Sequence, residues 1–211
     1  MNWDNRRSML SIITGDIINS KRTVPGSWLK TLKKELRQWG PTPKQWEIYR
    51  GDSFQLEVQD PADALGVAVG IKAAIKSQKG TDVRLAIGIG NKTYNAKTIS
   101  ESNGSAFVNS GDLLEELKRM KLNMAVRSDT LVFDLEMNLY IKLALIAMNT
   151  WTRNSAMTVH AALRYPDKSQ KALGKLLGIR QNAVSTRLKR ACHDEIIEVI
   201  KMYRKKVADI I

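Results

Sequence analysis

Cysteine and histidine are nearly absent from this chain of 211 residues. The single thiol, Cys192, cannot form an internal disulfide, and two histidines far apart in sequence from one another, His160 and His193, provide no Cys/His metal cluster. Such cysteine usage is typical of a reducing compartment. We therefore expect a fold that is stabilised by its hydrophobic core, without disulfide bonds or a structural metal.

Long apolar runs are also lacking. No uncharged run approaches the roughly 18 residues that a membrane span requires, and the first eight residues contain no apolar signal core. We therefore expect a cytoplasmic protein that does not interact with a membrane. The chain has no low-complexity segment or repeat, and its hydrophobic fraction of 43% excludes a disordered protein.

Positive charge is abundant and unevenly distributed. The chain has 34 Lys and Arg against 21 Asp and Glu, which gives a formal net charge of +13. Residues 150–211 hold 13 of these basic residues and 5 of the acidic ones, a net charge of +8, although they make up less than a third of the chain. Such an excess is typical of proteins that bind polyanions, so the C-terminal part is the first candidate for nucleic-acid binding.

The N-terminal part alternates between strand and helix patterns. Residues 10–18 form an apolar, β-branched run that predicts a central strand, and residues 46–50 and 53–58 predict a hairpin around Gly51 and Asp52. Further patterns complete the order β-α-β-β-α-β-α-β, which favours a ferredoxin-like, palm-type sheet with helices on one face. From about Asp134 onward only helical patterns occur. We predict an α+β fold with an α/β domain at 1–135 and a helical domain at 136–211.

The sequence KALGKLLGIRQNAVSTRLKRA at 171–191 resembles a helix-turn-helix, which we place at 169–190. Gly174 is small where the two helices would cross, and Gly178 allows the backbone angle of the turn. The second helix and the residue before it offer side chains suited to bases and phosphates: Arg180, Gln181, Asn182, Ser185, Thr186, Arg187, Lys189 and Arg190. The alternatives are a helical hairpin with a solvated basic face and a module that contacts protein.

Two carboxylates stand out by position in the N-terminal part. Asp16 ends the predicted central strand and Asp52 lies at the tip of the neighbouring hairpin, so they would lie side by side. Together they could hold Mg²⁺ bound to a nucleoside triphosphate. The backbone amides from Ile17 to Ser20 would contact its phosphates, with Lys21 and Arg22 as flanking charges. The alternatives are a strand-end cap or an ion pair with Arg50 for Asp16, and a simple turn role for Asp52. Arg50 and Arg84 are candidate phosphate partners.

Four segments together resemble the SatD family, whose N-terminal part is similar to class III nucleotide cyclase and GGDEF domains. They are GDIINS at 15–20, YRGDSFQLEV at 49–58, VRLAIGIG at 83–90 and GSAFVNSGDLLEEL at 104–117. The resemblance extends over nearly the whole chain, since such proteins also have a helix-turn-helix-like tail.

The resemblance implies that Asp16 and Asp52 are metal ligands and that Asn109 is a ribose or phosphate contact. With the backbone and side-chain groups named above, the predicted nucleotide-binding residues are Ile17, Asn19, Ser20, Arg50 and Asn109. Leu113 replaces the cyclase arginine and Ile48 replaces the lysine that selects the base, so the resemblance implies the fold more strongly than the activity.

The sequence therefore predicts a cytoplasmic regulator in which the α/β domain binds a nucleotide, with or without Mg²⁺, and the tail binds DNA, in a homodimer that reads paired half-sites. One alternative is a Mg²⁺-dependent nucleotidyl cyclase or transferase with the tail as an interaction module. Another is an α/β domain that serves only as a scaffold for dimerisation.

Overall fold

A computed structural model describes residues 9–20 and 25–211; the predictions for residues 1–8, Lys21 and Arg22 lie outside this range. The described chain is an α+β fold. Its strands are β1 (Leu10–Ile18), β2 (Trp46–Tyr49), β3 (Ser53–Val58), β4 (Asp82–Gly90) and β5 (Met124–Arg127). The helices of the N-terminal part are α1 (Pro25–Leu36), α2 (Ala64–Lys76) and α3 (Ser105–Met120), with 3₁₀ turns η2 (Arg37–Trp39), η3 (Pro61–Asp63) and η4 (Ile99–Glu101). The C-terminal part contains α4 (Leu131–Thr150), α5 (Arg153–Arg164), α6 (Gln170–Leu177), α7 (Gln181–Arg190) and α8 (His193–Val207).

The five strands form one sheet in the order β2-β3-β1-β4-β5. β1 is antiparallel to both β3 and β4, β2 and β3 form a hairpin, and β5 is parallel to β4. The first four strands have the ferredoxin-like order, to which β5 adds an edge strand. This confirms the predicted α+β fold class and places β1 at the centre of the sheet.

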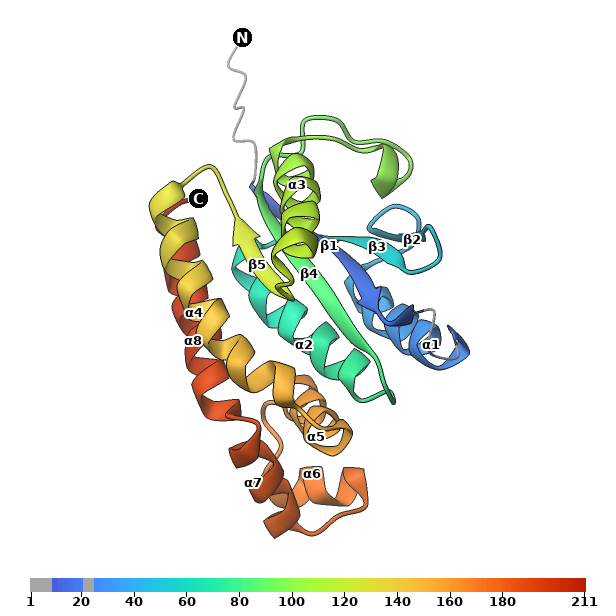
Figure 1. The fold of residues 1–211 in the computed structure, drawn as a ribbon, viewed down its shortest axis with the longest axis vertical. Helices are drawn as coiled ribbons and strands as arrows, with labels where there is room; N and C mark the ends of the chain where they lie inside the picture. The colour runs from blue at the N-terminus through green and yellow to red at the C-terminus, as the bar shows by residue number, and fades with distance from the viewer. Residues whose placement is uncertain (1–8, 21–24) are drawn as a thin grey trace.

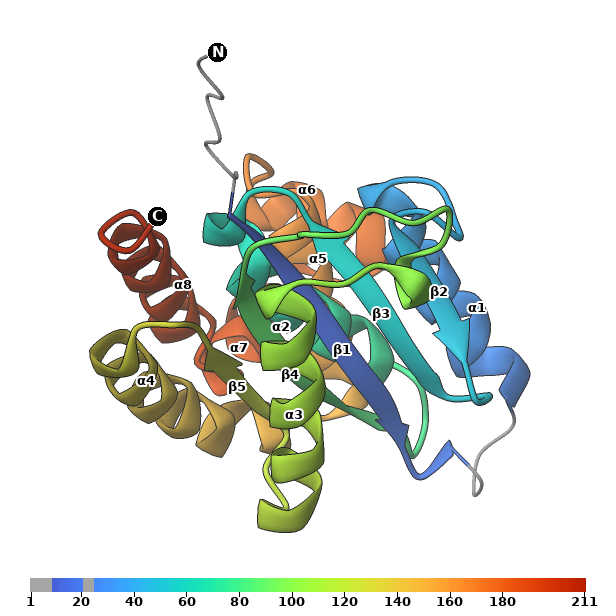
Figure 2. The same cartoon turned by 90° about the horizontal axis from the view of Figure 1, so that it is seen from above.

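Helices cover both faces of this sheet, although the sequence predicted helices on one face only (Figure 2). α1 and α2 lie on one face, and α3 crosses the other face over β1 and β4 (Figure 2). Successive residues of β4 face opposite sides of the sheet, and Gly88 lies on the side of α3. Because glycine has no side chain, α3 can approach the sheet closely there. A Cβ at Gly88 would lie 2.2 Å from the carbonyl oxygen of Ala106 and 2.4 Å from the backbone nitrogen of Ser110, both in α3.

α2 is buried on nearly every side. Ten of its thirteen residues are buried, among them Lys72, whose side chain is fully inaccessible. The Lys72 ammonium lies 2.9 Å from the Asp82 carboxylate at the start of β4, and burial lowers the pKa of Lys72. The helix is buried this completely because the sheet covers one of its sides and α5 and α8 cover another.

The C-terminal helices pack directly on the α/β part (Figure 1). A single hydrophobic cluster extends from Ile13 in β1 to Val207 in α8. Polar contacts reinforce this junction: the Lys76 ammonium donates to the Asn149 carbonyl over 2.9 Å, and Arg204 pairs with Asp63 over 2.8 Å. The predicted domain division between residues 135 and 136 falls inside α4, a continuous helix of 20 residues.

Among the described residues, no helix is both long enough and apolar enough to cross a membrane.

The close approach of α3 to β4 yields a test of the packing. Gly88→Ala places a methyl group against the backbone of α3, so we expect the free energy of unfolding to fall by about 2–3 kcal/mol. The control is Gly111→Ala within α3, where an added Cβ meets nothing within 4 Å. That change favours the helix by about 1 kcal/mol. Chemical denaturation measures both, and equal stability of the two variants would contradict the described packing.

Candidate functional site

α6 and α7 form a helix-turn-helix whose turn depends on two glycines, as predicted. Gly178 ends α6 in the left-handed conformation, with φ of 66°. A Cβ at Gly174 would lie 2.7 Å from the carbonyl oxygen of Ile179, so only glycine lets the turn fold back this closely. At the other end of α6, the Ser169 hydroxyl accepts a hydrogen bond from the amide of Ala172. α5 packs against both α6 and α7, which completes a three-helix unit.

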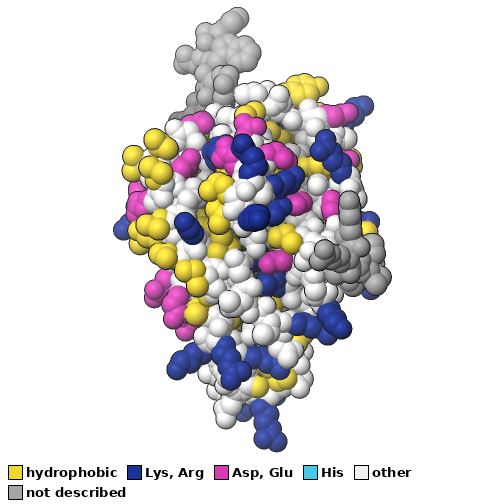
Figure 3. Space-filling view, viewed as in Figure 1, with side chains coloured by type: hydrophobic (Ala, Val, Ile, Leu, Met, Phe, Trp, Pro, Cys, Tyr) yellow, Lys and Arg dark blue, Asp and Glu magenta, His cyan; other side chains and the backbone are white. Residues whose placement is uncertain are grey.

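α7 buries one side and presents the other to solvent. Val184 and Leu188 are buried against the neighbouring helices. Seven of the eight predicted DNA-binding residues are exposed: Arg180, Gln181, Asn182, Ser185, Thr186, Lys189 and Arg190. Lys and Arg side chains gather at this end of the molecule, in the region of α6 and α7 (Figure 3). The exposed surface therefore combines amide and hydroxyl groups with positive charge.

Arg187 differs from the other seven residues. It is only half-exposed, and its Nη1 atom is buried without a hydrogen-bond partner among the described residues. Arg187 precedes the buried Leu188 and lies one turn after the buried Val184, so part of its side chain turns toward the module interior. Sequence reasoning treated all eight positions alike because helical spacing alone does not show how far a long side chain folds back.

Asp16 and Asp52 lie at the same end of the sheet. The backbone amide of Ile17 donates to the Asp52 carbonyl oxygen over 3.1 Å, which joins the end of β1 to the hairpin turn. The Asp52 carboxylate accepts a hydrogen bond of 2.5 Å from the Ser20 hydroxyl. Asn19 and Arg50 are exposed near these carboxylates, both with positive φ, at 64° and 53° respectively.

The carboxylate of Asp16 is bound by Arg84. The Nη1 atom of Arg84 lies 3.0 and 2.9 Å from the two Asp16 oxygens, and its Nε atom donates to the Leu122 carbonyl. Arg84 is directly opposite Asp16 on the neighbouring strand β4. The predicted alternative for Asp16, an ion pair with Arg50, therefore needs correction: the partner is Arg84, whose position opposite Asp16 on β4 brings its guanidinium to the carboxylate.

The structure does not bring Asn109 to this end of the sheet. Its side-chain amide donates to the Ile89 carbonyl oxygen over 2.9 Å and approaches the Asp129 carboxylate. Ile89 lies five residues beyond Arg84 along β4, a separation of about 16 Å at the usual rise of a strand. Asn109 thus holds the N-terminal half of α3 to the far end of β4.

Asp16 and Asp52 are ligands of the type that Mg²⁺ uses. Proteins bind this ion through one or two carboxylates when a nucleotide supplies phosphate oxygens as further ligands. Binding both oxygens of Asp16 would require Arg84 to move away. No group of three or more His, Cys, Asp or Glu within the described ranges could hold a metal by itself. The metal and nucleotide sites therefore stay predictions.

Tyr49 is a residue of this region that sequence reasoning missed. Burial raises the pKa of its hydroxyl, Arg50 lowers it, and the charges of Glu115 and Asp16 raise it. Tyr49 ends β2, so the hairpin, α3 and β1 all place charges around it. No sequence pattern indicates this, since Glu115 is distant along the chain.

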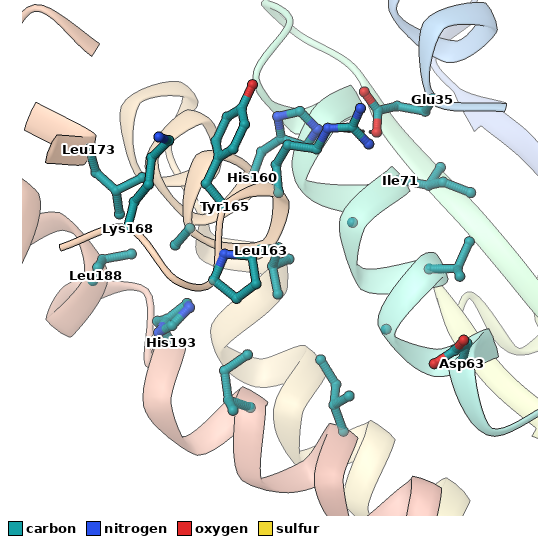
Figure 4. A pocket seen from close by; sticks show the side chains of 18 of the residues that line it. Glu35, Asp63, Ile71, His160, Leu163, Tyr165, Lys168, Leu173, Leu188 and His193 are labelled. Carbon is teal, nitrogen blue, oxygen red and sulfur yellow. Dashed lines mark ion pairs between the residues drawn. The ribbon is translucent and has the colours of Figure 1, made fainter. Parts of the chain in front are cut away.

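A cavity of about 690 Å³ is lined by residues of both the α/β part and the helix-turn-helix (Figure 4). Glu35 and Ile71 line it on one side, and Leu173 and Leu188 from α6 and α7 line it on the other. His160 bridges the junction, with its Nε2 atom 3.1 Å from the Glu35 carboxylate. Its lining comes from six α-helices and the loop at 165–168, so the cavity leaves no local signal in the sequence.

Comparison with known proteins adds little. The chain matches no protein-family model and no curated protein. The matching solved structures include a crystal structure of the regulator of polyketide synthase expression from Bifidobacterium adolescentis, at 14% identity, with 94% of this chain and 86% of that chain covered. The TM-score is 0.30, which carries no argument about function. The resemblance to the SatD family stays a prediction.

The tight turn of the helix-turn-helix can be tested by substitution. In Gly174→Ala the added methyl group meets the Ile179 carbonyl, so we expect the free energy of unfolding to fall by about 1–3 kcal/mol. Lys175→Ala, at the exposed neighbouring position, is the control and should be nearly neutral. Urea titration of both variants is the measurement. If Gly174→Ala were as stable as the control, α6 and α7 would not pack as described.

Proposed function

We propose that this protein is a regulator that binds double-stranded DNA through α7. The observation that carries the proposal is the outward surface of α7, where six exposed polar and basic side chains lie on a helix that packs against α5 and α6, with the exposed Arg180 just before it. In helix-turn-helix proteins the second helix enters the major groove with its N-terminal residues on the base edges.

Two kinds of contact follow from the chemistry of the side chains. Gln181 and Asn182 occupy the first turn of α7, and their amides can pair with an adenine edge. Arg180 and Arg190 flank the helix at its two ends and would bind phosphates, which contribute affinity and salt dependence without sequence choice. The net charge of +8 on residues 150–211 supplies long-range attraction to DNA.

Removing the two flanking arginines tests the DNA proposal. In the double variant Arg180→Ala, Arg190→Ala we expect affinity for a random-sequence duplex to fall by on the order of tenfold. The slope of log affinity against log salt concentration should become shallower by about 2, one for each lost phosphate contact. Fluorescence anisotropy across a salt series measures both quantities.

The control removes two exposed arginines from the α/β part, Arg37→Ala with Arg119→Ala, and loses the same charge. If both double variants lost affinity equally, binding would reflect net charge and not α7. Absence of duplex binding by the wild type at low salt would overturn the proposal.

A second candidate function is binding of a Mg²⁺-nucleotide by the α/β part. The observation in its favour is the joining of Asp16 and Asp52 at one sheet end by the hydrogen bond from Ile17 to Asp52. Two carboxylates beside the exposed backbone turn around Gly51 are the groups that a metal-bound triphosphate uses. Binding of a Mg²⁺-nucleotide at this site would be the first step of a cyclase or transferase reaction.

Thermal unfolding with ATP or GTP tests this second candidate. A nucleotide present at 100 times its dissociation constant should stabilise the wild type by about 2.7 kcal/mol, and only with Mg²⁺. The stabilisation should vanish in the double variant Asp16→Ala, Asp52→Ala and persist in Asp112→Ala, which removes an exposed carboxylate from α3. If neither nucleotide raised the unfolding temperature of the wild type, ATP and GTP would be excluded as ligands, and the DNA proposal would be unaffected.

A further inference from the structure

α4 exposes a continuous apolar stripe on the side opposite its core contacts. Its members are large aliphatic residues with between 54% and 74% of their surface exposed: Leu131, Val132, Leu135, Leu139, Leu143 and Ile146. They are six of the fourteen large hydrophobic residues that are exposed in the described chain. Figure 3 shows hydrophobic side chains running down the left side of the molecule in the region of α4. We call these six residues the α4 stripe.

The spacing of the α4 stripe keeps it straight along the helix. From Val132 to Ile146 its members follow each other at intervals of three and four residues, which is the pattern of one helix face. The opposite face of α4 is buried, with Phe133, Met137 and Ile141 in the core. α4 is therefore apolar on two opposite sides, although only one side has a partner in the described chain.

The size of the α4 stripe fits a protein interface. Six aliphatic residues exposed to this degree amount to roughly 600 Å² of accessible surface, a size at which patches on monomers mark interaction sites. An apolar groove of about 380 Å³ between α4 and α8 continues the surface and is lined by Leu143, Ile146 and Val199 among others. The stripe and the groove share Leu143 and Ile146, so together they form one continuous apolar surface over α4 and α8.

The charges on α4 select among partners. The helix carries two acidic residues and one basic residue in a chain of net charge +13. DNA and anionic lipid surfaces attract basic helices, so neither suits this face. Two copies of a positively charged chain repel one another least where their facing surfaces are apolar and carry no excess of positive charge. A second copy of this chain meets these conditions, and its own α4 stripe is an apolar surface of matching length, as a two-fold interface requires.

Glu136 and Lys142 flank the α4 stripe on its two sides. At 100° per residue they lie about 60° to either side of Leu139. Glu136 is on the side of α8, where it pairs with Lys206 over 2.7 Å, and Lys142 is exposed on the other side. When two α4 helices run in the same direction about a two-fold axis, the Glu136 side of each meets the Lys142 side of its partner. Helices running in opposite directions would instead bring the two Lys142 sides together, whereas Glu136 on the other side is paired with Lys206.

We propose that the protein forms a homodimer in which the α4 stripes of two copies pack against each other with their helices running in the same direction. Both helix-turn-helix units then lie at the same end of the dimer, as the reading of paired half-sites requires. This last consequence rests on the proposed DNA function. The pairing itself does not, and it is tested without DNA.

Sedimentation equilibrium over a concentration series tests the pairing. We expect the wild type to move from 23.7 kDa toward twice that mass as its concentration rises. Leu139→Glu places a charge at the centre of the stripe and should raise the dimer dissociation constant about 30-fold or more. The control Met120→Glu changes another hydrophobic residue, 63% exposed at the end of α3, and should have no effect.

Two outcomes would overturn the homodimer. One is a wild type that stays at the monomer mass at every concentration. The other is a dimer that Leu139→Glu and Met120→Glu affect equally. Because residue 139 is more than half exposed, Leu139→Glu should keep the wild-type circular dichroism spectrum. Leu135→Lys is a second stripe variant that must weaken the dimer in the same way.

Cysteine cross-linking tests the direction of the helices. In a Cys192→Ser background, Val132→Cys and Ile146→Cys each place one thiol at one end of the stripe. In the proposed dimer each variant, oxidised alone, should form a disulfide-linked pair, because identical positions face each other across the axis. If neither variant links alone but a mixture of the two does, the helices run in opposite directions and the proposed arrangement is wrong.

Discussion

The complete burial of α2 is the constraint on which the rest of the structure depends. The sheet covers one side of this helix, and its other side is apolar as well, so α5 and α8 must cover it. Lys72 is the single charge in α2 that is fully buried, and Asp82 neutralises it at the start of β4. An unpaired charge there would cost several kcal/mol, so this ion pair fixes the register of α2 on the sheet. The helical part is thereby attached to a rigid surface.

The two ends of the central strands serve different purposes. At one end Asp16 and Arg84 neutralise each other across β1 and β4, next to Asp52 and the hairpin turn. At the other end Asn109 fastens α3 to β4. Mg²⁺ at the first end would compete with the Arg84 guanidinium for the Asp16 carboxylate, so metal binding there would depend on how strongly the Leu122 carbonyl holds Arg84.

Charge and apolar surface are separated on the outside of the C-terminal part. The basic side chains gather in the region of α6 and α7, whereas hydrophobic side chains line α4 (Figure 3). Such a separation permits one region to approach a polyanion while another binds protein, since neither surface interferes with the other. The cavity is lined by residues of α2, α8 and the helix-turn-helix, and no residue of α4 lines it.

Much of the fold could be predicted from local pattern. The bounds of β1, the hairpin and the two glycines of the helix-turn-helix follow from alternation, turn residues and helical spacing, which are properties of neighbouring residues. The second layer on the sheet, the Asp16–Arg84 pair, the half-buried Arg187 and the position of Asn109 depend on residues far apart in sequence. The sequence by itself determined the elements and the basic character of the tail. Only the tertiary structure decided which side chains meet, because contact between distant segments depends on how whole helices pack and not on local spacing.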